Sequence, residues 1–133
     1  MKSDGKNTMS ARQVYLLVCA IGIVPIALSY GLFPKASLGL LFGLELSEPN
    51  GVHIFRAIMG LYLALAVFWL AGYARRNIRQ AAIWSAVVFM FGLAAGRMLS
   101  LLVDGPGSWL LQAYLGLELV FGAAGAVLLA KSD

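Results

Sequence analysis

Four long runs of apolar residues dominate the chain, and short polar stretches separate them. They cover about residues 14–33, 52–73, 81–103 and 108–130. A helix needs about 20 mostly apolar residues to cross a bilayer, because the hydrocarbon is roughly 30 Å thick and each residue rises about 1.5 Å. None of the runs shows the polarity alternation of a membrane β-barrel strand. The pattern therefore predicts an all-α bundle of four transmembrane helices over residues 14–130, with an N-terminal tail of residues 1–13 and a C-terminus of residues 131–133.

The segment between the first two runs is too apolar for an open loop and too short to cross a bilayer. It contains Leu38, Leu40, Leu41, Phe42, Leu44 and Leu46. A stretch of about 12 residues with this composition is typical of an interfacial or re-entrant helix. We expect such a helix over residues 35–46, followed by a turn at Pro49-Asn50-Gly51.

Composition agrees with a lipid environment. Of the 133 residues, 61% are hydrophobic and only 12% are charged, about half the charged share of an ordinary soluble domain. A soluble chain this short could not bury so much apolar surface. The net charge of +4 does not indicate a nucleic-acid partner, because the basic residues flank apolar runs and form no stripe with interleaved aromatics.

Charge in the connections predicts the orientation. One set of connections and termini carries seven basic residues: Lys2, Lys6, Arg12, Arg75, Arg76, Arg79 and Lys131. The other set carries only Lys35 among basic residues, together with Glu45, Glu48 and Asp104. Positively charged connections stay on the cytoplasmic side. We therefore expect a protein of the bacterial inner (plasma) membrane with both termini on the cytoplasmic side.

The first run has an alternative interpretation, and aromatic residues near the run ends indicate where the membrane interfaces lie. The first run resembles a signal peptide, because a basic start and an apolar stretch precede Ala27-Leu28-Ser29. The apolar stretch continues past that site, so we favour an uncleaved anchor. Aromatic residues near the run ends are expected as interfacial anchors: Tyr15, Trp69, Tyr73 and Trp84 on the inner side, and Tyr30, Phe33 and Trp109 on the outer side.

Polar residues recur at helical spacing inside three of the runs. They form three sets, each predicted to share one helix face: His53, Arg56 and Gly60; Arg97, Ser100 and Asp104; Tyr114, Glu118 and Gly122. All three sets lie toward the outer half of the expected bundle.

A charge that faces lipid at such depth costs about 3 kcal/mol, so the charged residues should pair with one another. Arg97 with Glu118 is the preferred pair, because a long arginine side chain can bridge several ångströms. Arg56 could join Glu118 from the other side. Asp104 could cap the third run or contact His53.

Three interpretations of this cluster remain open. Buried ion pairs often specify only the registry of helices. A polar pocket for a lipid or another small amphipathic ligand is a second interpretation; its candidate residues are Asn50, His53, Arg56, Arg97, Ser100, Tyr114 and Glu118. The third is a catalytic site with Glu118, Asp104 or His53 as general acid or base. One cysteine and one histidine do not indicate a metal site, and no motif indicates a cofactor.

These motifs resemble those of a family of small bacterial four-helix membrane proteins of unknown function. The resemblance rests on Asn50-x-x-His53-x-x-Arg56 with Gly60 and Tyr62, and on Gly96-Arg97-x-x-Ser100-x-x-x-Asp104-Gly105-x-Gly107 with Glu118. It implies the four-helix fold and gives weight to these polar positions, but it implies no reaction. We therefore predict a ligand-binding or accessory membrane subunit in contact with membrane lipids, either homo-oligomeric or part of a larger membrane complex. A membrane enzyme acting on a lipid or isoprenoid is the alternative.

Overall fold

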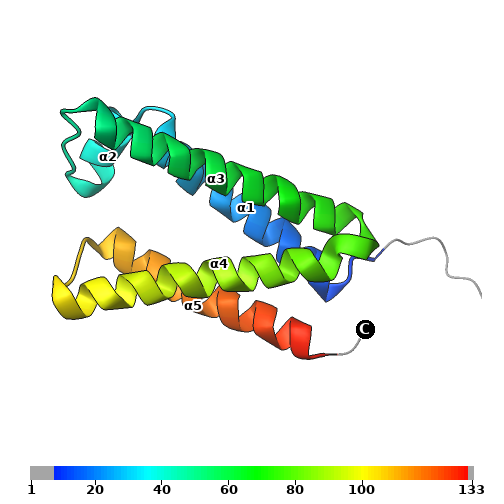
Figure 1. The fold of residues 1–133 in the computed structure, drawn as a ribbon. Helices are drawn as coiled ribbons and strands as arrows, with labels where there is room; N and C mark the ends of the chain where they lie inside the picture. The colour runs from blue at the N-terminus through cyan, green and yellow to red at the C-terminus, as the bar shows by residue number, and fades with distance from the viewer. Residues whose placement is uncertain (1–7, 132–133) are drawn as a thin grey trace, which may run out of the picture.

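The computed structural model describes residues 8–131, which form five α-helices (Figure 1). In chain order these are α1 (Ala11–Gly31), α2 (Pro34–Phe42), α3 (Pro49–Ala74), α4 (Arg76–Val103) and α5 (Trp109–Ala130). This part of the chain contains no strand. Lys2 and Lys6, which contribute to the predicted charge asymmetry, lie outside the described residues. The all-α prediction of four long helices and one short helix is confirmed.

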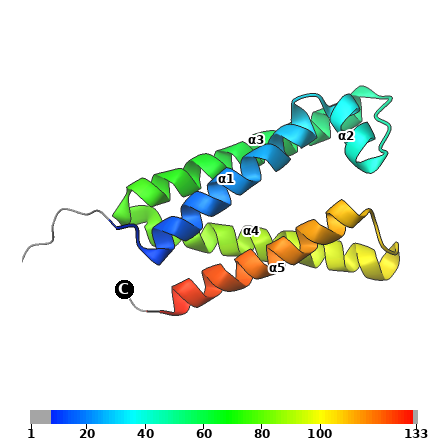
Figure 2. The same cartoon turned by 180° about the vertical axis from the view of Figure 1, so that it is seen from behind.

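The long helices form two antiparallel hairpins (Figures 1 and 2). The first hairpin pairs α1 with α3, and the second pairs α4 with α5; α3 also contacts α4. We call the end that carries α2 and the α4–α5 connection the α2 end. The start of α1 and the end of α5 lie at the opposite end, which we call the terminal end.

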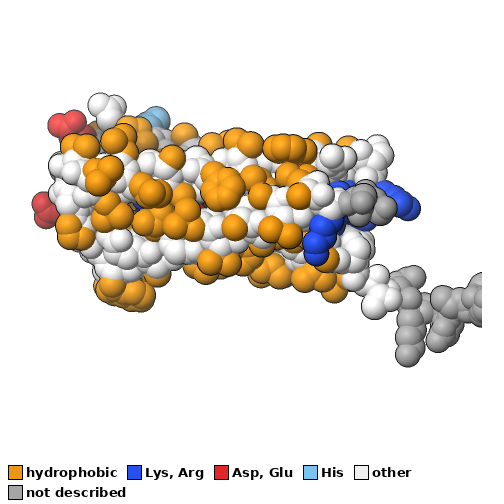
Figure 3. Space-filling view, turned by 90° about the horizontal axis from the view of Figure 1, so that it is seen from below, with side chains coloured by type: hydrophobic (Ala, Val, Ile, Leu, Met, Phe, Trp, Pro, Cys, Tyr) orange, Lys and Arg blue, Asp and Glu red, His pale blue; other side chains and the backbone are white. Residues whose placement is uncertain are grey.

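The four long helices are long and apolar enough to cross a membrane, which indicates a multi-pass membrane protein. Large apolar side chains lie on the outside of the bundle: Leu102 is 86% exposed and Val88 is 65% exposed. On the face in Figure 3, hydrophobic side chains cover the length of the molecule, with Lys and Arg at the terminal end and Asp and Glu at the α2 end. This surface suits a lipid environment with water at both ends.

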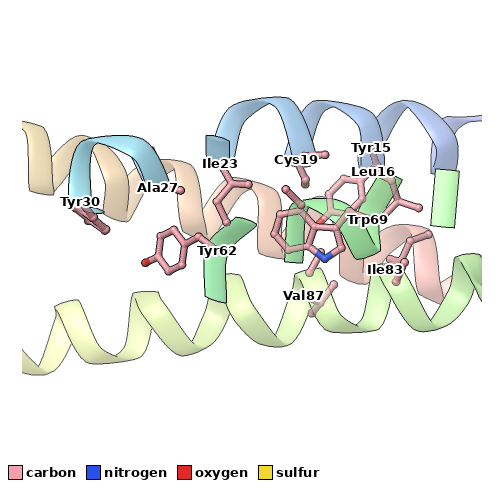
Figure 4. Packing of buried hydrophobic residues seen from close by; sticks show 14 of the residues in the cluster. Tyr15, Leu16, Cys19, Ile23, Ala27, Tyr30, Tyr62, Trp69, Ile83 and Val87 are labelled. Atoms are coloured by element: carbon pink, nitrogen blue, oxygen red, sulfur yellow. The ribbon is translucent and has the colours of Figure 1, made fainter. Parts of the chain in front are cut away.

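The core lies between the two hairpins, toward the terminal end. Figure 4 shows Trp69 of α3 between Leu16 and Cys19 of α1 and Ile83 and Val87 of α4. The Trp69 indole Nε1 donates a hydrogen bond of 2.9 Å to the Ser85 hydroxyl. Small residues let the helices approach closely. A Cβ on Gly72 of α3, for example, would clash with the Ala82 Cβ of α4.

Several predicted interfacial anchors belong to this core instead. Tyr15, Tyr30 and Trp69 are 7%, 7% and 0% exposed, so that part of the anchor prediction is wrong. The Tyr15 hydroxyl and the Trp69 indole each donate a hydrogen bond inside the protein, which removes the cost of burying these two polar groups. Trp109 and Trp84 remain exposed at 79% and 53%.

The predicted short helix exists, but it is shorter than expected. It runs over Pro34–Phe42 and ends because Gly43 adopts a left-handed conformation with φ 68°, which glycine tolerates without steric cost. Leu38 is fully buried against the bundle, whereas Leu40 is 87% exposed. The helix α2 therefore packs on the end of the bundle through one face.

Candidate functional site

Arg97 of α4 and Glu118 of α5 form the ion pair at the centre of the candidate site. The Arg97 Nε donates to both carboxylate oxygens of Glu118, each at 2.9 Å. The two side chains are 21% and 8% exposed. The predicted pair is therefore confirmed, and it removes the isolated charge that each residue would otherwise present to hydrocarbon.

Aromatic side chains enclose the guanidinium of this pair. The Arg97 Cζ lies 5.5 Å from the centre of the Tyr114 ring, within the range of a cation–π interaction. Tyr30 of α1 also lies beside the guanidinium. Only the Nε of Arg97 donates to Glu118. The two terminal guanidinium nitrogens donate no hydrogen bond to this carboxylate. The pair is neutral as a unit, yet it retains hydrogen-bond donors.

An apolar cavity of about 130 Å³ extends from this pair between α1 and α5. Its lining comes from all four long helices and is mostly aliphatic or aromatic: Val18, Cys19, Gly22, Ile23, Ile26, Tyr62, Phe89, Met90, Leu93, Arg97, Tyr114, Leu117, Glu118 and Phe121. We call this space the cleft. Val18 and Leu117 are 44% and 51% exposed on opposite sides of it. The cleft therefore opens sideways, onto the apolar surface of the bundle.

Contacts at both ends of the cleft join α5 to α1 and to α2. At the terminal end, the Tyr15 hydroxyl donates a 2.7 Å hydrogen bond to the Phe121 carbonyl. Arg12 also donates to carbonyls in the last turn of α5 and just beyond it. At the α2 end, the rings of Phe42 and Tyr114 lie 6.5 Å apart, edge to face. Over their whole length α1 and α5 make few direct contacts.

Arg56 and His53 do not belong to this site. The Arg56 Nε donates a 3.2 Å hydrogen bond to the Gly31 carbonyl at the end of α1, so the predicted contact of Arg56 with Glu118 is wrong. Arg56 and His53 line a different hollow, with Lys35 and the starts of α2 and α3. The physical reason is that α3 turns another face, with Tyr62 and Trp69, toward the bundle.

Asp104, Ser100 and Asn50 also lie away from the cleft. Asp104 caps the end of α4, as one of its two predicted roles required, and its backbone N–H donates to the Ser100 carbonyl at 2.7 Å. No contact joins Asp104 to His53 within residues 8–131, so the other predicted role is wrong. Both Ser100 and Asp104 line an outer hollow of α4 and α5 that Arg97 borders from its other side. Asn50 is exposed in the first turn of α3.

A family model described as Domain of unknown function (DUF4345) matches residues 11–129. The chain belongs to this family. The match covers all five helices of this DUF4345 protein almost end to end. Neither the curated proteins nor the solved structures contain a match to the chain. Family membership supports the fold and leaves the activity to be inferred from the geometry of the site.

Residues that the sequence analysis did not assign to a site complete the two sites. Gly22 and Cys19 line the cleft. Lys35 lines the hollow that also contains His53 and Arg56. The apolar lining carries no sequence signal, because every span is apolar. Lys35 did carry one: it is the only basic residue in the connections at the α2 end.

Proposed function

We propose that this protein binds an uncharged amphipathic molecule from the bilayer, with the polar head beside Arg97 and Glu118 and an apolar part in the cleft. The observation that carries the proposal is the neutral, donor-bearing ion pair at the end of an apolar cleft that opens sideways. A cavity of about 130 Å³ is comparable with an engineered apolar cavity of about 150 Å³ that binds benzene. It fits one ring or a short chain segment, and the rest of the ligand would extend into lipid.

Charge balance favours a neutral head. Glu118 already neutralises Arg97 across two 2.9 Å contacts, so a second anion would have to compete with a buried carboxylate. A carbonyl, ester or hydroxyl oxygen could accept from the terminal guanidinium nitrogens without that competition. Ligand pockets commonly combine an apolar lining with a few polar groups that orient the ligand.

The separation of the candidate acids and bases supports binding more than catalysis. Glu118 lies in the cleft, whereas Asp104 and His53 line two other hollows. A general acid or base must itself lie within hydrogen-bond reach of the proton that it transfers, so Asp104 and His53 cannot act on a molecule in the cleft. Of the three candidates, only Glu118 lies in the cleft, and its carboxylate is already held by Arg97, which does not exchange protons at neutral pH.

Orientation in the membrane follows from the charges at the two ends. We propose that the protein lies in a plasma membrane with the α2 end facing outward and both termini on the cytoplasmic side. The basic residues Arg75, Arg76 and Arg79 at the α3–α4 turn support this orientation. A reporter fused to the C-terminus that is active only in the cytoplasm tests this topology. Activity of a periplasmic reporter at the same position would contradict it. A homo-oligomer or a larger membrane complex stays a prediction.

Photo-cross-linking tests the binding proposal. The probe is 1-monooleoylglycerol with a diazirine in its acyl chain, added to the purified protein in nonionic detergent. We expect saturable labelling of peptides from α1, α4 and α5, which supply nearly all of the lining. Gly22→Leu should reduce the labelling about tenfold, because the new side chain fills the mouth of the cleft. A Cβ at Gly22 meets no atom within 4 Å, so this variant should fold normally.

A matched control separates blockage of the cleft from a general effect of a new leucine. Gly60 of α3 is also exposed, and a Cβ there also meets no atom within 4 Å; it does not line the cleft. Gly60→Leu should leave labelling unchanged. Leu117→Trp should also reduce labelling, because the larger side chain narrows the mouth of the cleft from the α5 side. Equal labelling of all four long helices, or normal labelling of Gly22→Leu, would contradict the proposal.

A further inference from the structure

A second hollow lies at the α2 end, apart from the cleft. Its volume is about 610 Å³, and its lining comes from the starts of α2 and α3 and the connection between them. Three of the residues that line it are basic: Lys35, His53 and Arg56. Among residues 8–131, no acidic residue lines it. The hollow therefore concentrates positive charge at one place on a chain in which only 12% of residues are charged.

The basic groups of this hollow are not neutralised within the described part of the chain. Lys35 and His53 have no hydrogen-bond or ion-pair partner there, and Arg56 donates only its Nε, to the Gly31 carbonyl at 3.2 Å. That bond fixes the side chain and leaves the terminal guanidinium nitrogens for a ligand. This is the opposite of Arg97, whose charge is met by a carboxylate.

The packing of α1 on α3 holds Arg56 in this position. A Cβ on Gly31 would lie 2.5 Å from the Met59 Cβ and 3.2 Å from the Arg56 Cα. Only glycine permits this close approach of the end of α1 to α3. The approach brings the Gly31 carbonyl, at the negative end of the α1 dipole, next to the Arg56 guanidinium.

Two helix N-termini reinforce the positive potential. Both α2 and α3 begin with proline, and neither has a side-chain cap, in contrast to α1 and α5, which Ser10 and Ser108 cap. The first N–H groups of a helix have no acceptor within the helix and carry partial positive charge. Pro34, Lys35 and Ala36 from α2 and Pro49, Val52 and His53 from α3 line the hollow.

Membrane topology does not account for this charge. The α2 end carries Glu45, Glu48 and Asp104 and is the end with few basic residues, so Lys35 and Arg56 oppose the charge asymmetry that orients the spans. We propose that Lys35, His53 and Arg56 form a binding site for a phosphate group. Three basic side chains and two helix starts match the charge and the several acceptor oxygens of phosphate.

The position of the hollow beside exposed apolar side chains leaves two sources for the phosphate group. Phe33 beside it is 67% exposed, and Ile54 on the adjacent turn of α3 is 59% exposed. These exposed apolar side chains border the hollow at the start of a membrane-spanning helix, which favours a place at the level of lipid headgroups. The phosphate is therefore either that of an anionic lipid or a soluble phosphate at the membrane surface, and the two are distinguished by experiment. This proposal does not depend on the one made for the cleft.

The single histidine of the chain provides the measurement. His53 is the only histidine, so its imidazole resonance in NMR reports on this hollow alone. The full-length protein in nonionic detergent is titrated at constant pH and ionic strength with inorganic phosphate in one series and with lysophosphatidic acid in another. A saturable shift of the His53 resonance is expected in at least one series. If inorganic phosphate alone produces the shift, the ligand is a soluble phosphate. If only lysophosphatidic acid produces it, the ligand is a lipid.

Variants test the residues. Lys35→Gln and Arg56→Gln should each weaken the binding about tenfold, the loss expected from one charge-assisted hydrogen bond. Lys35→Gln is the safer variant, because Lys35 has no partner within residues 8–131 whose loss would disturb folding. Arg76→Gln, at the opposite end, is the matched control and should bind as the wild type does. No saturable shift in either series, or equal binding by Lys35→Gln and wild type, would overturn the proposal.

Discussion

Two arginines lie toward the α2 end of this bundle in different surroundings. Arg97 meets a buried carboxylate through Nε at 2.9 Å from each oxygen. Arg56 meets only a backbone carbonyl, at 3.2 Å, and lies among other basic residues at the surface. The first arginine contributes no net charge to its site, whereas the second contributes its full charge.

This difference teaches how an apolar chain can use the same side chain for two purposes. Deep in the bundle, an unpaired guanidinium costs too much, so pairing is required and the site that results is neutral. Near the interface, water and lipid headgroups lower that cost, so the charge can stay available for a ligand. The depth of each arginine therefore decides which ligands its site can attract.

Arg97→Gln should have the largest effect on stability. It leaves the Glu118 carboxylate without its partner in a buried position, and the expected loss is about 3–5 kcal/mol in the free energy of unfolding. Reversible unfolding in mixed micelles measures this loss. The comparison predicts that no comparable loss follows from removing Arg56.

A double variant sharpens the same prediction. Arg97→Gln combined with Glu118→Gln removes both charges, so its loss should be clearly smaller than the sum of the two single losses. Additive losses would mean that the two side chains do not stabilise each other. Arg76→Gln, with an exposed side chain at the terminal end, should change stability by less than about 0.5 kcal/mol.

Gly31→Ala should have an intermediate effect on stability and a direct effect on the second hollow. The new Cβ would clash with Met59 and with the backbone of Arg56, so α1 and α3 must separate, at a cost of about 1–3 kcal/mol. The separation also moves the carbonyl that holds Arg56, and phosphate binding should weaken. Gly60→Ala, where a Cβ meets no atom within 4 Å, is the control and should leave both quantities nearly unchanged.

Arg56→Gln should lower stability less than Arg97→Gln or Gly31→Ala does. It removes one hydrogen bond at an exposed position, so the loss in the free energy of unfolding should be about 1 kcal/mol. The same variant should still weaken phosphate binding. A stability loss as large as that of Arg97→Gln would show that Arg56 is a structural residue and would remove the contrast between the two arginines.

The fold and one ion pair could be predicted from the sequence because both follow from the cost of polarity in lipid. Long apolar runs must be helical, since no other single segment satisfies its backbone hydrogen bonds in hydrocarbon. Arg97 and Glu118 lie deep in such runs, where an opposite charge is the cheapest partner. The end of the short helix was less predictable, because it depends on the left-handed turn at Gly43.

The position of Arg56 could not be predicted for a geometric reason. Spacing along a helix shows which residues share a face, but not which neighbour that face meets. At about 100° per residue, the buried Tyr62 and Trp69 of α3 lie roughly 120–140° around the helix from Arg56. The close approach of Gly31 to α3 sets this rotation, and nothing in the apolar pattern reports it.

The cleft was beyond sequence analysis for a related reason. It depends on how α1 and α5 are joined: the Tyr15 hydroxyl near the start of α1 donates to the Phe121 carbonyl in the middle of α5, and the two helices make few other direct contacts. Such a joint depends on one hydroxyl that reaches one carbonyl across two helices. In the sequence, Tyr15 resembles an interfacial anchor.

One lining residue of the cleft gives the protein a natural reporter. Cys19 is the only cysteine of the chain, is 3% exposed and lines the cavity. A small membrane-permeant maleimide must enter the cavity to alkylate this thiol. The alkylation rate of the unaltered protein is thus a measure of vacancy, and any molecule that fills the space should slow the modification in intact membranes without a single engineered residue.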